Sequence, residues 1–243
     1  MEYRRLGNAG IKLSALGLGG WTTFGESVTD LERAQRIIQA AYEGGINFFD
    51  IADAYARGRA EEVMGEILAA YSRHTLVIST KAYWPMSDDI NDRGLSRKHL
   101  TESIHKSLKR IGTDYVDIYF CHRHDPDTPV EEVVRTMDDL IHQGKVLYWG
   151  TSEWPAARIA EAVGIAKQYG LNAPRVEQPQ YNLLVRNRVE QQVLPVAKEF
   201  GIGLTTFSPL ATGVLTGKYD QGIPEDSRFA RMDGLREHWM RDE

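Results

Sequence analysis

The segment Leu76-Val-Ile-Ser-Thr-Lys81 decides the fold class, because it is a short apolar run that ends on a charged side chain. A similar run from Val116 to Cys121 ends directly before His122. Short continuous runs of Val, Ile, Phe and Tyr are typical of parallel strands that are covered on both faces. Polar residues that follow such strands gather on one face of a parallel barrel. The two segments therefore predict a parallel sheet with a site at the carboxyl ends of its strands.

The same alternation of short apolar runs and longer segments with helical periodicity continues along the chain. It predicts strands over Leu16–Gly19, Asn47–Asp50, Leu76–Lys81, Val116–Cys121, Leu147–Thr151, Arg175–Gln178 and Gly203–Phe207. It predicts helices near Thr29–Glu43, Ala60–Ala70, Ser96–Arg110, Val130–Gln143, Ala156–Tyr169 and Arg188–Phe200. Thr29 and Ser96 are expected N-caps. Helix ends are expected at Gly44, Gly112, Gly144, Gly170 and Gly201.

Repeated strand and helix units without a break in composition predict one domain over residues 1–243, and the closest regular architecture is the (β/α)₈ barrel of α/β type. The eighth strand is missing from this pattern, because the polar segment Asp220–Glu243 contains no apolar run. Since an open barrel leaves unpaired edges, we expect a chain shortened at its C-terminus. An open doubly wound sheet is the alternative, although Gly17-Leu-Gly-Gly-Trp-Thr22 lacks the final glycine of the dinucleotide fingerprint.

The composition, with 243 residues, 42% of them hydrophobic and 26% charged, is that of an ordinary globular protein. A net charge of -5 and a pI near 5.8 argue against nucleic-acid binding, which needs clustered Lys and Arg. Met1–Gly10 lacks a signal-peptide run, and no stretch approaches the ~20 apolar residues of a membrane helix, so we expect a cytoplasmic protein. The only cysteine, Cys121, is predicted to be a small core residue, which excludes a metal site built on thiolates.

Four polar residues, Asp50, Tyr55, Lys81 and His122, fall at or just after the ends of successive predicted strands. A carboxylate, a phenol, an ammonium and an imidazole that meet at one place indicate proton transfer to a carbonyl oxygen. Each residue alone also has a structural interpretation, as a turn cap, a loop aromatic, a solvated strand end or a satisfied polar group. His122 and His124 invite a metal interpretation, but two imidazoles with no evident third ligand make a weak site.

Ordered motifs run through nearly the whole chain, namely Asn47-Phe-Phe-Asp-Ile-Ala-Asp-Ala-Tyr55, Ile78-Ser-Thr-Lys81, Arg93-Gly-Leu-Ser-Arg-Lys98, His122-Arg-His-Asp-Pro-Asp-Thr-Pro129, Gly144-Lys-Val-Leu-Tyr-Trp-Gly-Thr-Ser152, Phe207-Ser-Pro-Leu210 and Gly217-Lys-Tyr219. With these motifs the chain resembles the aldo-keto reductases. It is most similar to the branch that includes bacterial reductases and the β-subunits of voltage-gated potassium channels. The resemblance implies a (β/α)₈ barrel whose eighth strand and final helix, which in relatives help to hold the 2′-phosphate of NADP, are missing here.

The resemblance also assigns a role to each of the four polar residues. Tyr55 is the expected general acid, and the Lys81 ammonium is expected to bring the phenol pKa down from its usual value of about 10. Asp50 would keep Lys81 charged and oriented. His122 would donate a hydrogen bond to the carbonyl oxygen and align the substrate. Channel-associated relatives often have Asn at the position of His122, so its presence favours an active reductase.

NADP(H) is the cofactor implied by the resemblance. Positions that match Ser152 and Gln178 hold the nicotinamide carboxamide in relatives, and Tyr181 lies where an aromatic ring often stacks on the nicotinamide, although some channel-subunit relatives have His there. The loop that passes the pyrophosphate matches Phe207, Ser208, Pro209, Leu210 and Thr212. Lys218 and Arg228 would supply positive charge, and solvated loop charges are their alternative.

The remaining site residues face the nicotinamide and the substrate. Gly20 and Trp21 match such positions, although several relatives have Thr in place of Gly20, so that one hydroxyl contact is lost. Asp50 is included among the cofactor contacts. Trp84 would wall the substrate pocket, with a packed core tryptophan as its alternative. The expected substrate contacts are Trp21, Tyr55, Trp84 and His122.

Taken together, the sequence predicts an NADPH-dependent reductase of small aldehydes or ketones with Tyr55 as the proton donor. A second hypothesis is a regulatory subunit that binds nucleotide and reports redox state to a partner protein. A barrel hydrolase or lyase is disfavoured by the four polar residues. The sequence identifies neither the substrate nor a protein partner, and it leaves a monomer and a symmetric homo-oligomer both open.

Overall fold

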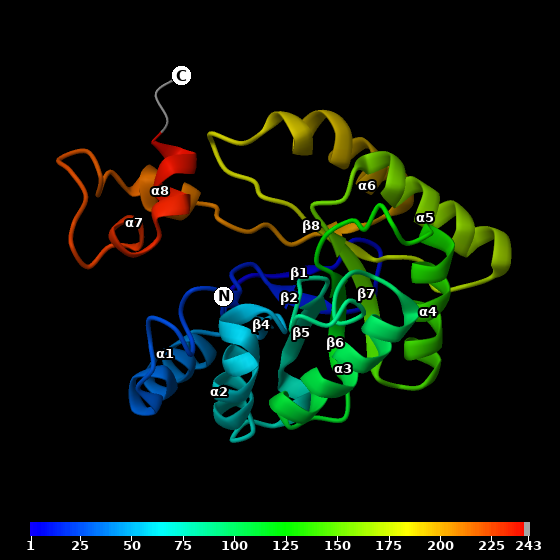
Figure 1. Cartoon of the computed structure of the whole chain (residues 1–243), viewed down its shortest axis with the longest axis horizontal. Coiled ribbons are helices and arrows are strands. Elements are labelled where there is room, and N and C mark those ends of the chain that lie inside the picture. The colour runs from blue at the N-terminus through cyan, green and yellow to red at the C-terminus, as the bar shows by residue number, and fades with distance from the viewer. Residues whose placement is uncertain (241–243) are drawn as a thin grey trace.

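A computed structural model describes residues 1–240 and contains a sheet of seven parallel strands (Figure 1). The strands are β3 (Leu18–Gly19), β4 (Phe48–Asp50), β5 (Val77–Ala82), β6 (Val116–Cys121), β7 (Val146–Ser152), β8 (Val176–Gln178) and β9 (Gly203–Leu204). They are paired in chain order, so that each crossover joins neighbouring strands. The sheet curls into a half-barrel with helices around it, which confirms the expected barrel fold as a partial (β/α)₈ barrel.

The helices that follow the strands form the outer layer of the half-barrel. They are α1 (Leu31–Glu43), α2 (Arg59–Leu68), α3 (Arg97–Ile111), α4 (Val130–His142), α5 (Ala156–Tyr169) and α6 (Leu194–Phe200), the last preceded by a π-helical turn over Val189–Val193. Each packs against the next along the chain. A doubly wound sheet needs helices on both faces, so that alternative does not fit this arrangement.

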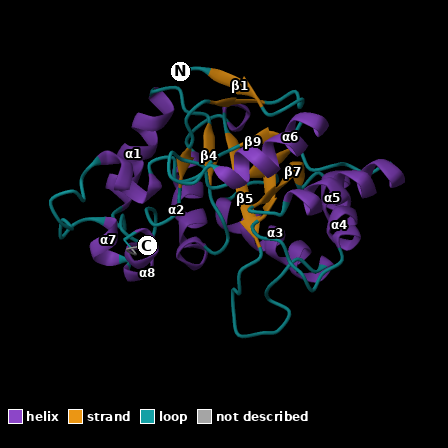
Figure 2. Ribbon diagram, turned by 90° about the horizontal axis from the view of Figure 1, so that it is seen from above, coloured by secondary structure: helices purple, strands orange, loops and turns teal. Residues whose placement is uncertain are grey.

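An N-terminal hairpin, which the sequence pattern did not predict, lies at one end of the half-barrel. Its antiparallel strands are β1 (Tyr3–Arg5) and β2 (Lys12–Ser14). The hairpin lies across the amino ends of the parallel strands (Figure 2), where the Ser14 N–H donates to Asn47 Oδ1 at 2.7 Å. It packs into the barrel interior with an apolar cluster of Leu6, Ala9, Leu13, Phe48, Val77, Ile118, Phe120 and Val176.

The two apolar clusters explain why the strands are hydrophobic throughout. Along β6, Ile118 and Phe120 point into the barrel, whereas Tyr119 and Cys121 point toward the helices. Both faces of β5 and β6 are therefore buried, as their continuous apolar runs predicted. Cys121 is a fully buried free thiol, which confirms its assignment to the core.

Local boundaries differ from the sequence prediction in two instructive places. Thr29 is not the N-cap of α1, because the helix begins one residue later and the Asp30 carboxylate accepts the Arg33 N–H at 2.9 Å. The last strand is shorter than Gly203–Phe207, because Pro179 on the neighbouring segment offers no N–H to extend the ladder, and Phe207 keeps only an isolated bridge to Gln180. Ser96 caps α3 as predicted by accepting the His99 N–H at 3.2 Å.

Beyond β9 the described chain contains a 3₁₀ turn over Ala211–Thr216 and two short helices, α7 (Arg228–Arg231) and α8 (Asp233–Trp239). These helices lie on the side of the molecule away from α4 and α5 (Figures 1 and 2). Within the described part of the segment Asp220–Glu243 there is no strand, as expected, and residues 241–243 lie outside the described residues. Among the helices of residues 1–240, none has the length and apolar character needed to cross a bilayer.

Candidate active site

The carboxyl ends of β4, β5 and β6 bring the four predicted catalytic residues to one place. Asp50 is the last residue of β4 and lies opposite Ser79 of β5, while Lys81 lies near the end of β5 opposite Phe120 of β6. His122 directly follows β6, and Tyr55 begins a 3₁₀ turn shortly after β4. Parallel pairing in register therefore accounts for the convergence of residues that are far apart in sequence.

Lys81 is the centre of this group. Its Nζ donates to Asp50 Oδ2 at 2.7 Å, to the Ile51 carbonyl at 2.8 Å and to Tyr55 Oη at 3.1 Å. The Lys81 side chain is 0% exposed and that of Asp50 is 15% exposed. An ammonium has three N–H donors, so all of them are used. The phenol hydroxyl of Tyr55 is thereby held against a buried, fully bonded cation.

The charges around Lys81 and Tyr55 oppose the cost of burial to different extents. Burial disfavours the charged ammonium, but Asp50 and Tyr55 outweigh it, and the pKa of Lys81 is raised. Burial also raises the pKa of Tyr55, and it outweighs the opposite effect of Lys81. The lysine thus acts on the phenol in the expected direction, but the expected net decrease of the Tyr55 pKa is wrong, because burial outweighs the ammonium. With its pKa raised above the usual value, the phenol is protonated at neutral pH. A protonated phenol is the form that a proton donor needs.

His122 completes the group from the side of β6. Its ring meets that of Tyr55 edge-on at a centroid distance of 5.7 Å. Burial, with the nearby charges of Lys81 and Arg123, holds the pKa of His122 well below its usual value, so the imidazole is neutral. Its buried Nδ1 has no hydrogen-bond partner among the described residues. His124 faces elsewhere, with its ring against Trp154 at 5.1 Å, so the two imidazoles do not converge as metal ligands would.

Two residues that are predicted to bind the cofactor, Ser152 and Gln178, lie at the ends of β7 and β8 next to this group. Gln178 Nε2 donates to Asp50 Oδ1 at 3.3 Å, and Ser152 Oγ donates to the Gln178 carbonyl at 2.9 Å. Both side chains are buried. Gln178 Nε2 makes only one other contact, to Thr205 Oγ1 at 3.4 Å, so its amide group is loosely held at the carboxyl end of the sheet.

Gly20 and Trp21 lie in the loop after β3, beside the end of β4. The Gly20 N–H donates to the Asp50 carbonyl at 2.8 Å. A Cβ at Gly20 would lie 2.8 Å from Ile51 Cγ2 and 3.2 Å from Met64 Sδ, so a Thr at this position would require the Ile51 side chain to shift. The guanidinium of Arg228 lies 5.9 Å from the Trp21 ring, which brings these two predicted residues together.

The predicted pyrophosphate loop has an unusual backbone. Ser208, Ala211 and Thr212 adopt positive φ angles of 50°, 49° and 55° without being glycine. Successive residues of this kind can turn several N–H groups to one side and form an anion-binding concavity. Phe207 and Pro209 belong to the same loop, in which Leu210 is 54% exposed. The loop is held to the β8 side by Asn182 Nδ2, which donates to the Ser208 carbonyl at 3.0 Å.

Two further predicted residues are placed at the edge of the site. The Tyr181 hydroxyl donates to Glu190 at 2.8 Å, so its ring is anchored toward the segment that precedes α6. Lys218 is exposed and its Nζ lies 5.0 Å from the Tyr219 ring. Trp84 lies beside the group, with its ring 6.1 Å from that of His122.

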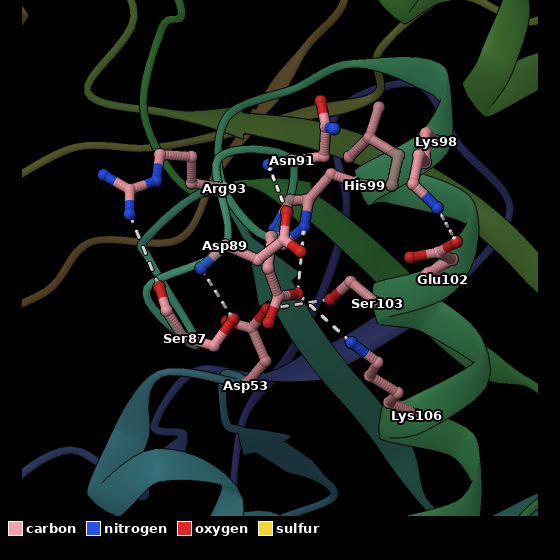
Figure 3. A network of polar contacts seen from close by, with 12 residues as sticks. Asp53, Ser87, Asp89, Asn91, Arg93, Lys98, His99, Glu102, Ser103 and Lys106 are labelled. Atoms are coloured by element: carbon pink, nitrogen blue, oxygen red, sulfur yellow. Dashed lines mark hydrogen bonds and ion pairs between the residues drawn. The ribbon is translucent and has the colours of Figure 1, made fainter.

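Sequence reasoning missed two buried carboxyl groups that support the site. Asp53, two residues before Tyr55, accepts from Ser103 Oγ at 2.8 Å (Figure 3), and burial followed by the charge of Glu61 raises its pKa to about 7. Glu177, beside Gln178, accepts from Thr151 at 2.5 Å, and burial raises its pKa to about 7. No sequence signal separates them from surface acids, because their burial depends on distant helices and strands.

Arg123 is a third residue that sequence reasoning missed, although it lies within the motif His122–Pro129. It follows His122, and its Nη1 donates to the His122 carbonyl at 2.5 Å and to Ser152 Oγ at 3.3 Å. Its guanidinium lies 5.6 Å from the Trp84 ring. Its position directly after a strand end was the signal that could have identified it.

Comparisons with known proteins relate the chain to one family. The family model described as "Aldo/keto reductase family" matches residues 15–237. A "Probable voltage-gated potassium channel subunit beta" of Arabidopsis thaliana is 52% identical over 233 residues, which cover 95% of this chain and 70% of that protein. A protein of the same description from Oryza sativa subsp. japonica is 51% identical over 233 residues, with the same coverage of 95% and 70%.

Proposed function

The chain belongs to the aldo/keto reductase family, and on this basis we propose that it reduces aldehydes or ketones to alcohols with NADPH as the hydride donor and Tyr55 as the proton donor. Membership of the family supports nicotinamide-dependent oxidoreduction of small carbonyl compounds. The proposal goes further than family membership in three respects. It specifies NADP rather than NAD, it assigns the four catalytic residues, and it gives the direction of the reaction.

One observation carries the proposal. A phenol hydroxyl lies 3.1 Å from a fully buried ammonium, and this ammonium lies 2.7 Å from a carboxylate. A neutral imidazole stands beside the same phenol. Reduction of a carbonyl group places negative charge on the oxygen, and a donor beside that oxygen lowers the barrier. Tyr55 and His122 are two such donors on one wall.

The residues around the four polar groups fit a nicotinamide dinucleotide. Gln178 offers a loosely bonded amide and Ser152 a hydroxyl at the carboxyl end of the sheet, which suit a carboxamide. The positive-φ loop from Ser208 to Thr212 suits a pyrophosphate, and Arg228 adds positive charge near Trp21. When bound, such a cofactor supplies the hydride that adds to the carbonyl carbon.

The protein residues then have separate tasks in the reaction. Tyr55 transfers its hydroxyl proton to the developing alkoxide oxygen, and the adjacent Lys81 ammonium stabilises the phenolate that remains. Asp50 keeps Lys81 charged and fixed in position. His122, neutral at working pH, donates to the same oxygen and thereby orients the carbonyl group.

Substitution of Tyr55 tests the proposal directly. We expect Tyr55→Phe to lower kcat/KM for a reactive aldehyde by about 10²- to 10⁴-fold, because the proton donor is lost. The measurement is NADPH oxidation by the purified chain, together with a fluorescence titration of NADPH binding, which the variant should retain. Tyr71→Phe, on the opposite end of the sheet, is the matched control. Unchanged turnover in Tyr55→Phe would contradict the assigned role.

A nucleotide-binding regulatory subunit is the second candidate, favoured by the names of the two plant relatives. Such a protein would bind NADPH but turn over slowly or not at all. Tight NADPH binding without oxidation across a broad panel of carbonyl compounds would favour this function over the reductase.

A further inference from the structure

Arg123 lies beside His122 and Trp84, and no step of the proposed reaction uses it. We propose that its guanidinium binds the carboxylate of the substrate, so that the preferred substrates are aldehydes that carry an acid group. The inference rests on the proposed function and specifies its substrate class.

Arg123 shares a continuous wall with the residues that face the carbonyl group. The Tyr55 and His122 rings are 5.7 Å apart, those of His122 and Trp84 are 6.1 Å apart, and the Arg123 guanidinium is 5.6 Å from Trp84. A molecule whose carbonyl oxygen meets Tyr55 and His122 and whose body lies along Trp84 therefore brings its other end toward Arg123. Trp84 is 40% exposed, so this wall is open to solvent.

The guanidinium has free donors on its open side. Both of its hydrogen bonds come from Nη1, which donates to the His122 carbonyl and to Ser152 Oγ. Nε and Nη2 make no hydrogen bond to residues 1–240, yet neither is a fully buried polar atom, so solvent reaches both. Two adjacent N–H groups on one planar edge match the two oxygens of a carboxylate.

The charge of Arg123 has no direct partner in the described chain. Within residues 1–240 no carboxylate lies within 4.0 Å of it, whereas Arg73, Arg110 and Arg188, which are also partly buried, each pair with an acid. Burial lowers the pKa of Arg123, and the more distant Glu153 opposes this effect. A guanidinium stays charged at any working pH. A partly buried guanidinium without an acidic partner is therefore a suitable binding group for an anion.

The test compares substrates that differ only in charge. The para and meta isomers of formylbenzoate carry a carboxylate, and their methyl esters present the same aldehyde without the charge. We expect the chain to prefer each acid to its ester in kcat/KM. Arg123→Met, which keeps the length of the side chain, should lower kcat/KM for each acid by about 10- to 100-fold more than for its ester, whose own decrease reports the lost hydrogen bonds to the His122 carbonyl and Ser152. Arg123→Lys should retain part of the preference.

Arg175→Met is the matched control, since Arg175 is also half-buried, has no ion pair within the described residues and lies at the opposite end of β8. Arg175→Met should leave kcat/KM unchanged for both the acids and the esters. Equal losses for acid and ester in Arg123→Met, or equal use of acid and ester by the unaltered chain, would overturn the proposal and leave the reductase function intact.

A second readout separates the two proposals if no aldehyde is reduced at all. Binding of benzoate to the NADPH-loaded chain, measured by calorimetry, should weaken by about 10-fold in Arg123→Met and not in Arg175→Met. Absence of turnover with this difference in benzoate affinity would reject the reductase but support the carboxylate site. Equal benzoate affinity in all three proteins would reject the carboxylate site.

Discussion

The β4–β6 part of the sheet and the β8–β9 part hold their functional side chains by different means. In the first part, the six-residue strands β5 and β6 hold Lys81 in a fully buried position, where it makes three hydrogen bonds. In the second, strands of three and two residues lead into a loop whose backbone adopts positive φ at Ser208, Ala211 and Thr212. The first part fixes side chains by ladder register, whereas the second presents backbone groups from an irregular segment.

This difference matches the two tasks that we propose. Proton transfer needs side-chain atoms held to within fractions of an ångström, which buried strands provide. Binding of a long, flexible dinucleotide needs an extended surface of N–H groups and positive charge, which a loop can provide. Substitutions of the buried strand residues in the first part are therefore expected to change both chemistry and stability, and substitutions of exposed residues in the loop that follows β9 are expected to change cofactor affinity alone.

Lys81→Met should have the largest effect. Loss of the ammonium leaves the Asp50 carboxylate with only Ser79 and Gln178 as partners and removes the cation beside Tyr55. We expect kcat/KM to fall by about 10³-fold or more and the free energy of unfolding to fall by about 3 kcal/mol. Aldehyde turnover and urea unfolding measure the two effects. Lys167→Met, on the exposed face of α5, is the control and should change neither turnover nor stability. If Lys81→Met were as stable as the unaltered chain, the proposed difference between the two parts of the sheet would be contradicted.

Asp53→Asn should change the pH dependence of stability. The pKa of Asp53 is about 7 in the folded chain, compared with a usual value of 3.8, and the group is buried with only Ser103 and a backbone N–H as close partners. Between these two pH values the folded carboxyl group holds a proton that the unfolded one has lost. Unfolding therefore releases a proton, and stability falls as the pH rises from about 4 to about 7.

Removal of the charge by Asp53→Asn should abolish this contribution, so the variant becomes more stable than the unaltered chain above pH 7, by on the order of 4 kcal/mol at most. Urea unfolding between pH 5 and about 8 measures the slope. Glu177→Gln sharpens the comparison, because Glu177 has the same pKa of about 7 but lies 3.4 Å from Arg188. The gain in stability above pH 7 should be smaller for Glu177→Gln than for Asp53→Asn, because Arg188 loses its ionic partner. If the stability of Asp53→Asn fell more steeply with pH than that of the unaltered chain, the raised pKa of Asp53 would be contradicted.

The convergence of the four candidate catalytic residues and most of the sheet could be predicted from the sequence because they depend on local patterns. Continuous apolar runs mark β5 and β6 through the burial of both strand faces, and Lys81 and His122 are recognisable as polar residues at strand ends. Ser96 shows itself as an N-cap because the capping bond lies within one helical turn.

What the sequence did not predict depends on contacts between distant segments. The strands β1 and β2 are each three residues long, and half of their residues are charged. The apolar contacts of the hairpin come from Leu6 and Leu13, which pack into the barrel. The roles of Asp53 and Arg123 follow from which groups surround them rather than from their own neighbours in the chain. The single-domain organisation over residues 1–243 stays a prediction.

Lys218→Met should have the smallest effect and tests the β8–β9 side of the comparison. Lys218 is exposed, and within residues 1–240 its Nζ has no acidic partner within 4.0 Å and rests near the Tyr219 ring. A solvent-exposed charge that contacts a phosphate contributes little in water, so we expect the Kd for NADPH to rise by about 3- to 10-fold, with kcat and stability unchanged. Fluorescence titrations at low and high salt measure it, and the difference from the unaltered chain should shrink as salt rises. Lys198→Met, another exposed lysine near the end of α6, is the control. A fall in kcat at saturating NADPH would mean that this loop also positions reacting atoms, and the division of labour between the two parts of the sheet would no longer hold.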